Sequence, residues 1–144
     1  MHYHGRNLRK GRFSAPGHVY HITTATQHRR PFFSDLSAAR TLIQSLKQED
    51  AIATTQTLAF VVMPDHLHWL FTLQAGDLSQ MVKRVKSVTS KRIGFSVWQS
   101  GFYDHAIRAE EDLLATARYI VANPLRANIV EHIGDYPHWD CVWL

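Results

Sequence analysis

Cysteine is almost absent from this sequence of 144 residues, and long apolar runs are missing altogether. The single cysteine, Cys141, excludes an intramolecular disulfide and a zinc site built from several cysteines. No apolar run approaches the roughly 20 residues of a membrane-spanning helix. The basic N-terminus has no apolar segment behind it, so we expect no signal peptide. These absences favour a cytoplasmic protein with no membrane partner.

Acidic residues are missing from two short stretches in which basic residues gather. The chain carries 16 Lys and Arg against 12 Asp and Glu, a net charge of +4, which permits a phosphate-rich partner without requiring one. The first stretch is an arm of residues 1–16, and the second is the segment 83–92. A basic helix can also be only a solvated face. The candidates for phosphate contact are Arg6, Arg9, Lys10, Arg12, Lys83, Arg84, Lys86, Lys91 and Arg92.

The order of the expected elements indicates an α+β fold. Runs rich in β-branched and aromatic residues predict strands over 19–26, 54–63, 66–73 and 102–107. Apolar residues at helical spacing predict helices over 36–50, 78–93, 110–121 and 125–132, followed by an irregular tail over 133–144. We expect one domain, residues 1–144, with a ferredoxin-like sandwich in which helices pack on one face of an antiparallel sheet. Strand 66–73 would be central in that sheet.

A histidine pair stands at the start of the third expected strand, in the segment MPDHLHWL at 63–70. Residues two apart on a strand point to the same face, so His66 and His68 would aim at one point. Two imidazoles on one face can bind a single metal ion, although many such pairs are ordinary surface histidines.

A tyrosine and an asparagine lie four residues apart in the segment RYIVANPLRA at 118–127. On a helix this spacing places Tyr119 and Asn123 on the same side. A tyrosine hydroxyl can act as a nucleophile and an amide oxygen can bind Mg²⁺ or Mn²⁺. The plainer interpretation is that Asn123 caps a helix before Pro124 and that Tyr119 packs at the rim of the core.

Five motifs, in this order, resemble those of the REP-associated tyrosine transposases, a group within the HUH single-tyrosine transposases. The resemblance covers nearly the whole chain, and its tail after residue 136 is shorter than usual. The motifs are PGHVYHIT at 16–23, MPDHLHWL at 63–70, WQSGFYD at 98–104, IRAEEDL at 107–113 and RYIVANPLRA at 118–127.

The resemblance implies a role for each matching residue. His66 and His68 match the metal-binding histidines, Asn123 stands at the third metal ligand, and Tyr119 matches the nucleophile. It further implies that a bacterial, nucleoid-associated enzyme cuts and rejoins single-stranded DNA at palindromic hairpins through a 5′-phosphotyrosine, with Mg²⁺ or Mn²⁺ as cofactor. Aromatic residues can stack on exposed bases, and the candidates are Trp69, Trp98, Phe102 and Tyr103.

Two other functions fit the same residues. The chain could bind hairpin DNA as a regulator without cutting it, or it could be a metal-dependent nuclease that uses water, in which case Tyr119 would be dispensable. A monomer and a homodimer are both compatible with the sequence. What removes the proton of the tyrosine hydroxyl, and which DNA sequence is recognised, do not follow from it.

Overall fold

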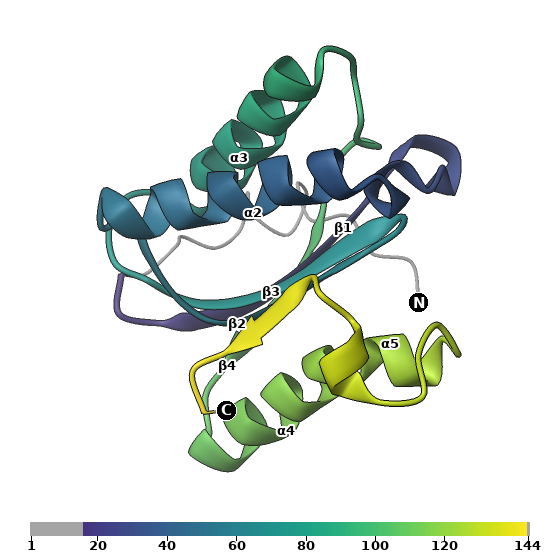
Figure 1. Ribbon diagram of the computed structural model, residues 1–144. Coiled ribbons are helices and arrows are strands. Elements are labelled where there is room, and N and C mark those ends of the chain that lie inside the picture. Colours follow the sequence, from purple (N-terminus) through teal and green to yellow (C-terminus); the bar gives the residue numbers. More distant parts are fainter. Residues whose placement is uncertain (1–15, 144) are drawn as a thin grey trace.

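Five antiparallel strands form one sheet in the computed structural model, which describes residues 16–143. The order across the sheet is β4-β1-β3-β2-β5, so β3 lies in the middle as predicted. Strand β1 pairs antiparallel with β3 from His66 to Thr72, and β2 pairs antiparallel with β3 from His66 to Leu73, with a register shift between Thr57 and Ala59 (Figure 1). The strands are β1 (Val19–Ala25), β2 (Thr55–Met63), β3 (His66–Leu73), β4 (Tyr103–Ile107) and β5 (Trp139–Cys141).

Two long helices cover one face of the sheet, α2 (Leu36–Ala51) and α3 (Leu78–Ile93). Each begins at an aspartate whose carboxylate accepts a backbone N–H of the first turn, Asp35 in α2 and Asp77 in α3. Alternate β3 residues, among them Trp69 and Phe71, are fully buried beneath these helices. The alternation of β3 therefore assigns its odd-numbered side chains to this core.

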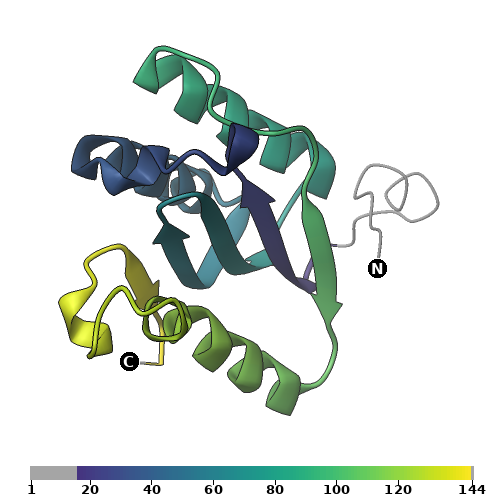
Figure 2. The same ribbon diagram turned by 90° about the vertical axis from the view of Figure 1, so that its right-hand side faces the viewer.

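The opposite face of the sheet carries α4 (Glu110–Val121) and the short α5 (Asn123–Arg126). Figure 2 shows these helices across the sheet from α2 and α3. Leu70 of β3 and Ile120 of α4 belong to a second, smaller core on this side. Because β3 side chains alternate, the face that holds Leu70 also holds His66 and His68.

The predicted α+β class and ferredoxin-like plan are confirmed, with α2 and α3 packed on one face and the strand order 4-1-3-2 extended by β5. The structure adds α4 and α5 on the other face, a placement the sequence analysis did not include. The bounds of α3 and β3 match the prediction at both ends.

Two predictions about the C-terminal part were wrong. Residues 125–132 do not form a helix, because α5 ends at Arg126 and Asn128 adopts a left-handed backbone with φ of 57°. The tail is not wholly irregular, because β5 pairs with β2 and extends the sheet.

The predicted basic arm lies almost entirely outside the described residues, and so do its candidates for phosphate contact, Arg6, Arg9, Lys10 and Arg12. In residues 16–143, no helix is long and apolar enough to span a membrane.

Candidate active site on the central strand

The β2–β3 hairpin places the histidine pair at the start of the central strand. His66 pairs with Ala25 of β1 and Met63 of β2, while His68 pairs with Thr23 and Val61. The two imidazole rings stand edge to face, with centroids 5.0 Å apart. The sequence therefore brings both rings to one point, on the face of the sheet that α4 covers.

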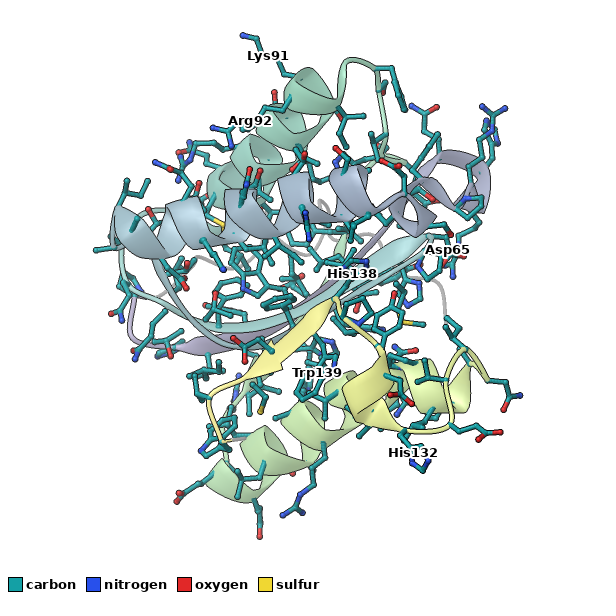
Figure 3. The ribbon with its side chains drawn as sticks, viewed as in Figure 1. Asp65, Lys91, Arg92, His132, His138 and Trp139 are labelled. Atoms are coloured by element: carbon teal, nitrogen blue, oxygen red, sulfur yellow. The ribbon has the colours of Figure 1, made fainter. Side chains whose placement is uncertain are left out.

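A carboxylate occupies one edge of the His66 ring. Asp65 Oδ1 lies 2.7 Å from His66 Nδ1, and Asp65 Oδ2 accepts a hydrogen bond of 3.0 Å from Arg29 Nε. Burial acts to raise the pKa of Asp65, but the hydrogen bonds from His66 and Arg29 outweigh it and hold the pKa below its usual value. Asp65 is thus a carboxylate at neutral pH, and it lies at the tip of the hairpin (Figure 3).

Side chains of β1 occupy the corresponding edge of the His68 ring. Thr23 Oγ1 and His21 Nε2 each lie 3.0 Å from His68 Nδ1. Burial, with the nearby cationic or protonatable groups, lowers the pKa of His68 to about 3, and burial with His105 lowers that of His21 to about 4. Both rings are therefore neutral above pH 6, the state in which an imidazole can bind a metal.

Both histidines consequently have Nδ1 engaged and keep Nε2 for another partner. Metal-binding histidines usually donate their second ring nitrogen to a carboxylate or a similar group, and the contacts of His66 and His68 fit this pattern. Among residues 16–143, no cluster of three or more His, Cys, Asp or Glu could hold a metal. A metal site here therefore needs a third ligand of another type, such as an amide.

Tyr119 of α4 faces the histidine pair across this site. Its ring centroid lies 6.0 Å from that of His68, and 51% of the residue is exposed. The guanidinium carbon of Arg126 lies 3.8 Å from the centre of the tyrosine ring, a cation–π contact between α5 and α4. Tyr119 is thus a half-exposed side chain next to His68, and Arg126 of α5 packs against its ring.

Asn123 is buried at the first position of α5, one helical turn beyond Tyr119. The helical hydrogen bonds run almost without a break through this point, because the N–H of Ala122 still bonds to the carbonyl of Arg118. Helix α5 packs against β2, the strand whose Met63 pairs with His66. The amide therefore lies on the same side of the sheet as the histidines.

The basic residues of α3 divide into two groups. Arg84 forms a two-pronged ion pair with the buried Glu49 of α2, and Lys86 donates to the carbonyls of Gln99 and Gly101. Arg84 therefore links α3 to α2, and Lys86 links α3 to the segment before β4. The other basic side chains predicted on this helix are exposed: Lys83, Lys91 and Arg92. Figure 3 shows Lys91 and Arg92 at the C-terminal end of α3.

The aromatic candidates for base stacking also divide. Trp69 is fully buried and Trp98 is 9% exposed, so both are core residues. Tyr103 on the edge strand is 48% exposed, and Phe102 is partly buried. Tyr103 is the one of the four with a largely accessible ring.

Sequence reasoning missed the side chains that surround the histidines. Asp65 carried a signal, because it directly precedes His66 at the hairpin tip. His21 and Thr23 carried no such signal, because their closeness to His68 depends on the register of β1 against β3. Arg29 lies 36 residues from Asp65 in a connection without periodicity, so no sequence pattern pointed to it.

A ferredoxin-like sheet with two histidines on its central strand and a tyrosine on the facing helix has the arrangement that we expected of the HUH tyrosine transposases. Residues 14–123 match the family model described as "Transposase IS200 like". The chain belongs to this family of transposases.

Relatives within the family confirm the predicted resemblance to REP-associated tyrosine transposases. The protein of that name from Escherichia coli K12 is 34% identical over 82 residues, covering 55% of this chain and 50% of the relative. A Haemophilus influenzae relative is 28% identical over 100 residues, covering 58% and 57%. This chain thus spans about half the length of these two relatives.

A solved structure of a REP-associated tyrosine transposase bound to a REP hairpin shares the fold. Its TM-score is 0.78 at 25% identity, with 89% of this chain and 79% of that chain covered. The similarity thus extends over most of the sheet and its helices.

The neutral, buried histidines predict that the metal-free protein loses stability in mild acid. The unfolded chain takes up protons near pH 6.5, whereas folded His68 and His21 resist protonation until about pH 3 and 4. Because the unfolded state binds more protons in this window, the free energy of unfolding falls as the pH is lowered, by about 4 kcal/mol between pH 7 and pH 5, with about half of the change from each histidine. Urea unfolding in EDTA at several pH values measures this free energy. We expect His21→Gln to reduce its dependence on pH. A flat profile in the unmodified protein would contradict the prediction.

The two groups of basic residues on α3 predict opposite phenotypes. Arg84→Met leaves the buried Glu49 without its partner, and we expect the free energy of unfolding to fall by about 3 kcal/mol. Lys83→Gln removes an exposed charge, so we expect unchanged stability and a salt dependence of DNA binding that is shallower by about one ion. Urea unfolding and binding titrations at several salt concentrations measure both. Equal stability of the two variants would show that the Arg84–Glu49 pair is dispensable.

Proposed function

We propose that this protein cuts and rejoins single-stranded DNA at palindromic hairpins, with Tyr119 as the nucleophile and His66, His68 and Asn123 as ligands of Mg²⁺ or Mn²⁺. The observation that carries the proposal is the meeting of Tyr119 with the histidine pair on one face of the sheet, with both Nδ1 edges already occupied. The REP hairpin in the related structure supports hairpin DNA as the substrate.

The chemistry is a transesterification. The Tyr119 oxygen bonds to phosphorus and its proton is released, while the bond from phosphorus to the 3′ oxygen breaks and that oxygen takes up a proton. The products are a 5′-phosphotyrosine and a free 3′-hydroxyl. Because the phosphodiester energy is kept in the tyrosine ester, a 3′-hydroxyl can attack it in the reverse sense and join strands without ATP.

The residues around Tyr119 have complementary tasks. Arg126 stacks on its ring and would restrain the ring beside His68. The Nε2 atoms of His66 and His68, with the Asn123 amide, provide the mixed nitrogen and oxygen donors that Mn²⁺ and Mg²⁺ accept. A divalent ion bound by them would polarise the scissile phosphate and offset the charge that develops on it.

A single chain supplies every proposed residue. Tyr119 and His68 come together within one protomer, so the site needs no helix exchanged with a second copy. We therefore propose that the protein acts as a monomer. Its exposed cations Lys83, Lys91 and Arg92, together with the basic arm, would contact phosphates of a DNA partner at the bacterial nucleoid.

A covalent-adduct assay tests the proposal. Labelled hairpin DNA with single-stranded flanks is incubated with protein and Mn²⁺, Mg²⁺ or EDTA, and the products are separated in a denaturing gel. We expect a protein–DNA band that depends on the metal. Binding in a native gel without any adduct would favour a regulator, and cleavage to free products without an adduct would favour a hydrolytic nuclease.

A further inference from the structure

Asp65 stands between His66 and Arg29 and bonds to both. One carboxylate oxygen lies 2.7 Å from His66 Nδ1 and the other accepts the Nε–H of Arg29 at 3.0 Å. A carboxylate can only accept hydrogen bonds. The ring nitrogen that faces it must therefore carry the hydrogen, and neutral His66 presents a lone pair at Nε2.

The backbone that delivers Arg29 is strained. His28 and Arg29 have φ values of 55° and 54°, a left-handed conformation that costs non-glycine residues about 1–2 kcal/mol each. Hydrogen bonds over the same short segment hold it in place, including Thr26 Oγ1 to the Arg30 carbonyl at 2.7 Å and the Gln27 N–H to the Val97 carbonyl at 2.8 Å.

The same segment is tied to the backbone of the hairpin tip. The Thr26 N–H donates to the carbonyl of Asp65 at 3.0 Å, and the Thr26 hydroxyl oxygen, whose hydrogen bonds mainly to the Arg30 carbonyl, lies 3.2 Å from the same oxygen. The connection after β1 and the tip of the β2–β3 hairpin thus form one unit, in which the Arg29 guanidinium meets the Asp65 carboxylate. Figure 3 shows Asp65 beside this connection.

Stability alone gives little reason for the ion pair. The Arg29 side chain is 59% exposed and that of Asp65 is 28% exposed, and pairs of this kind contribute about 0–1 kcal/mol. That contribution does not exceed the cost of two left-handed residues. The contact between Asp65 and His66 offers a functional reason for the ion pair and for the strained segment that carries Arg29.

We propose that Asp65 and Arg29 are positioning residues that lock His66 in the tautomer with hydrogen on Nδ1, so that Nε2 is free to bind the metal. Asp65 imposes the tautomer, and Arg29 holds the carboxylate at the ring. The proposal rests on the proposed metal-binding role of His66. Neither residue contacts the DNA strand or the metal in this role.

The tautomer of His66 is the first measurement, because it requires no metal. Long-range ¹H–¹⁵N NMR spectra of the metal-free protein distinguish the two ring forms. We expect the Nδ1–H form in the unmodified protein and a loss of this form in Asp65→Ala. Glu131→Ala, which removes an exposed carboxylate elsewhere, is the matched control and should leave the His66 signals unchanged.

An asparagine at position 65 makes the test directional. An amide has one acceptor and one donor end, and Arg29 requires the acceptor. The amide NH₂ would then face His66 and favour hydrogen on Nε2, the wrong form for a metal ligand. In the double variant Asp65→Asn with Arg29→Ala the amide is free to turn, so we expect the Nδ1–H form to return.

Binding of Co²⁺ supplies the functional readout. The visible absorption of Co²⁺ reports its coordination, and titration gives its affinity. We expect Asp65→Ala and Asp65→Asn to weaken binding about ten- to a hundredfold, the usual effect of losing a group that orients a metal-binding histidine. The double variant should bind more tightly than Asp65→Asn alone.

The outcomes separate this proposal from the proposed function. An Nδ1–H form that persists in Asp65→Ala, or a double variant no better than Asp65→Asn, would overturn the positioning role even if His66→Ala abolishes Co²⁺ binding. If the unmodified protein binds no Co²⁺ and forms no adduct, the proposed metal site fails and the positioning role fails with it. The predicted tautomers together with the predicted affinities would establish it.

Discussion

Tyr119→Phe is expected to abolish the covalent adduct with hairpin DNA while leaving DNA affinity nearly unchanged. The substitution removes one oxygen from a residue that is 51% exposed and keeps the ring that packs against Arg126. Folding should therefore be unaffected, whereas the atom that attacks phosphorus is gone. Denaturing gels measure the adduct, and native gels with the same labelled hairpin measure binding.

A second exposed tyrosine provides the control for this prediction. Tyr103 on β4 is 48% exposed, and Tyr103→Phe keeps its ring available to DNA. We expect its adduct to match that of the unmodified protein. Adduct formation that survives Tyr119→Phe would assign the nucleophile to another residue and remove the central element of the proposed function.

The histidine pair could be located from the sequence because it depends on short-range rules alone. An apolar run, a two-residue Pro-Asp break and an alternating segment were enough to predict the hairpin, and the period of two then assigned both rings to one face. Helix α3 was equally accessible, because Asp77 caps its start and Gly94, with φ of 106°, ends it.

Contacts between distant segments could not be predicted in the same way. Arg84 lies in an apparently solvated basic stretch, and only the packing of α2 on α3 shows that it faces the buried Glu49. The three residues of β5 are too few to show a periodicity, and they become a strand because β2 offers an unpaired edge.

The environment of the site was hidden for a related reason. Tyr119 lies near the histidines only if α4 covers the face of the sheet that holds them. The apolar pattern of an amphipathic helix does not indicate which face of a sheet the helix covers. The approach of Thr23 and His21 to His68 depends on strand register, and that of Arg29 to Asp65 depends on a strained connection. The sequence motifs thus identified the reacting groups, whereas their support required the fold.

His68→Gln is expected to eliminate metal-dependent cleavage and to leave the fold intact. His68 is the histidine whose ring approaches Tyr119, and its Nε2 is the nitrogen that remains for a metal. Glutamine is polar and can still bond to Thr23, so the free energy of unfolding should change little. We expect the rate of adduct formation to fall by about 10²- to 10³-fold or more, the usual effect of losing a group that stabilises transition-state charge.

The matched control is His105→Gln, because His105 pairs with His21 on the edge of the same sheet and is exposed. Single-turnover assays in Mn²⁺ measure the rates, and we expect this variant to react at the unmodified rate. Combined with Tyr119→Phe, the result separates three functions. A transesterase loses its adduct in both variants, a metal-dependent nuclease that uses water loses cleavage only in His68→Gln, and a regulator binds hairpin DNA equally well in both without cutting it. Only the first pattern requires the histidines and the tyrosine to act on the same phosphate, which is the relation that their shared face of the sheet makes possible.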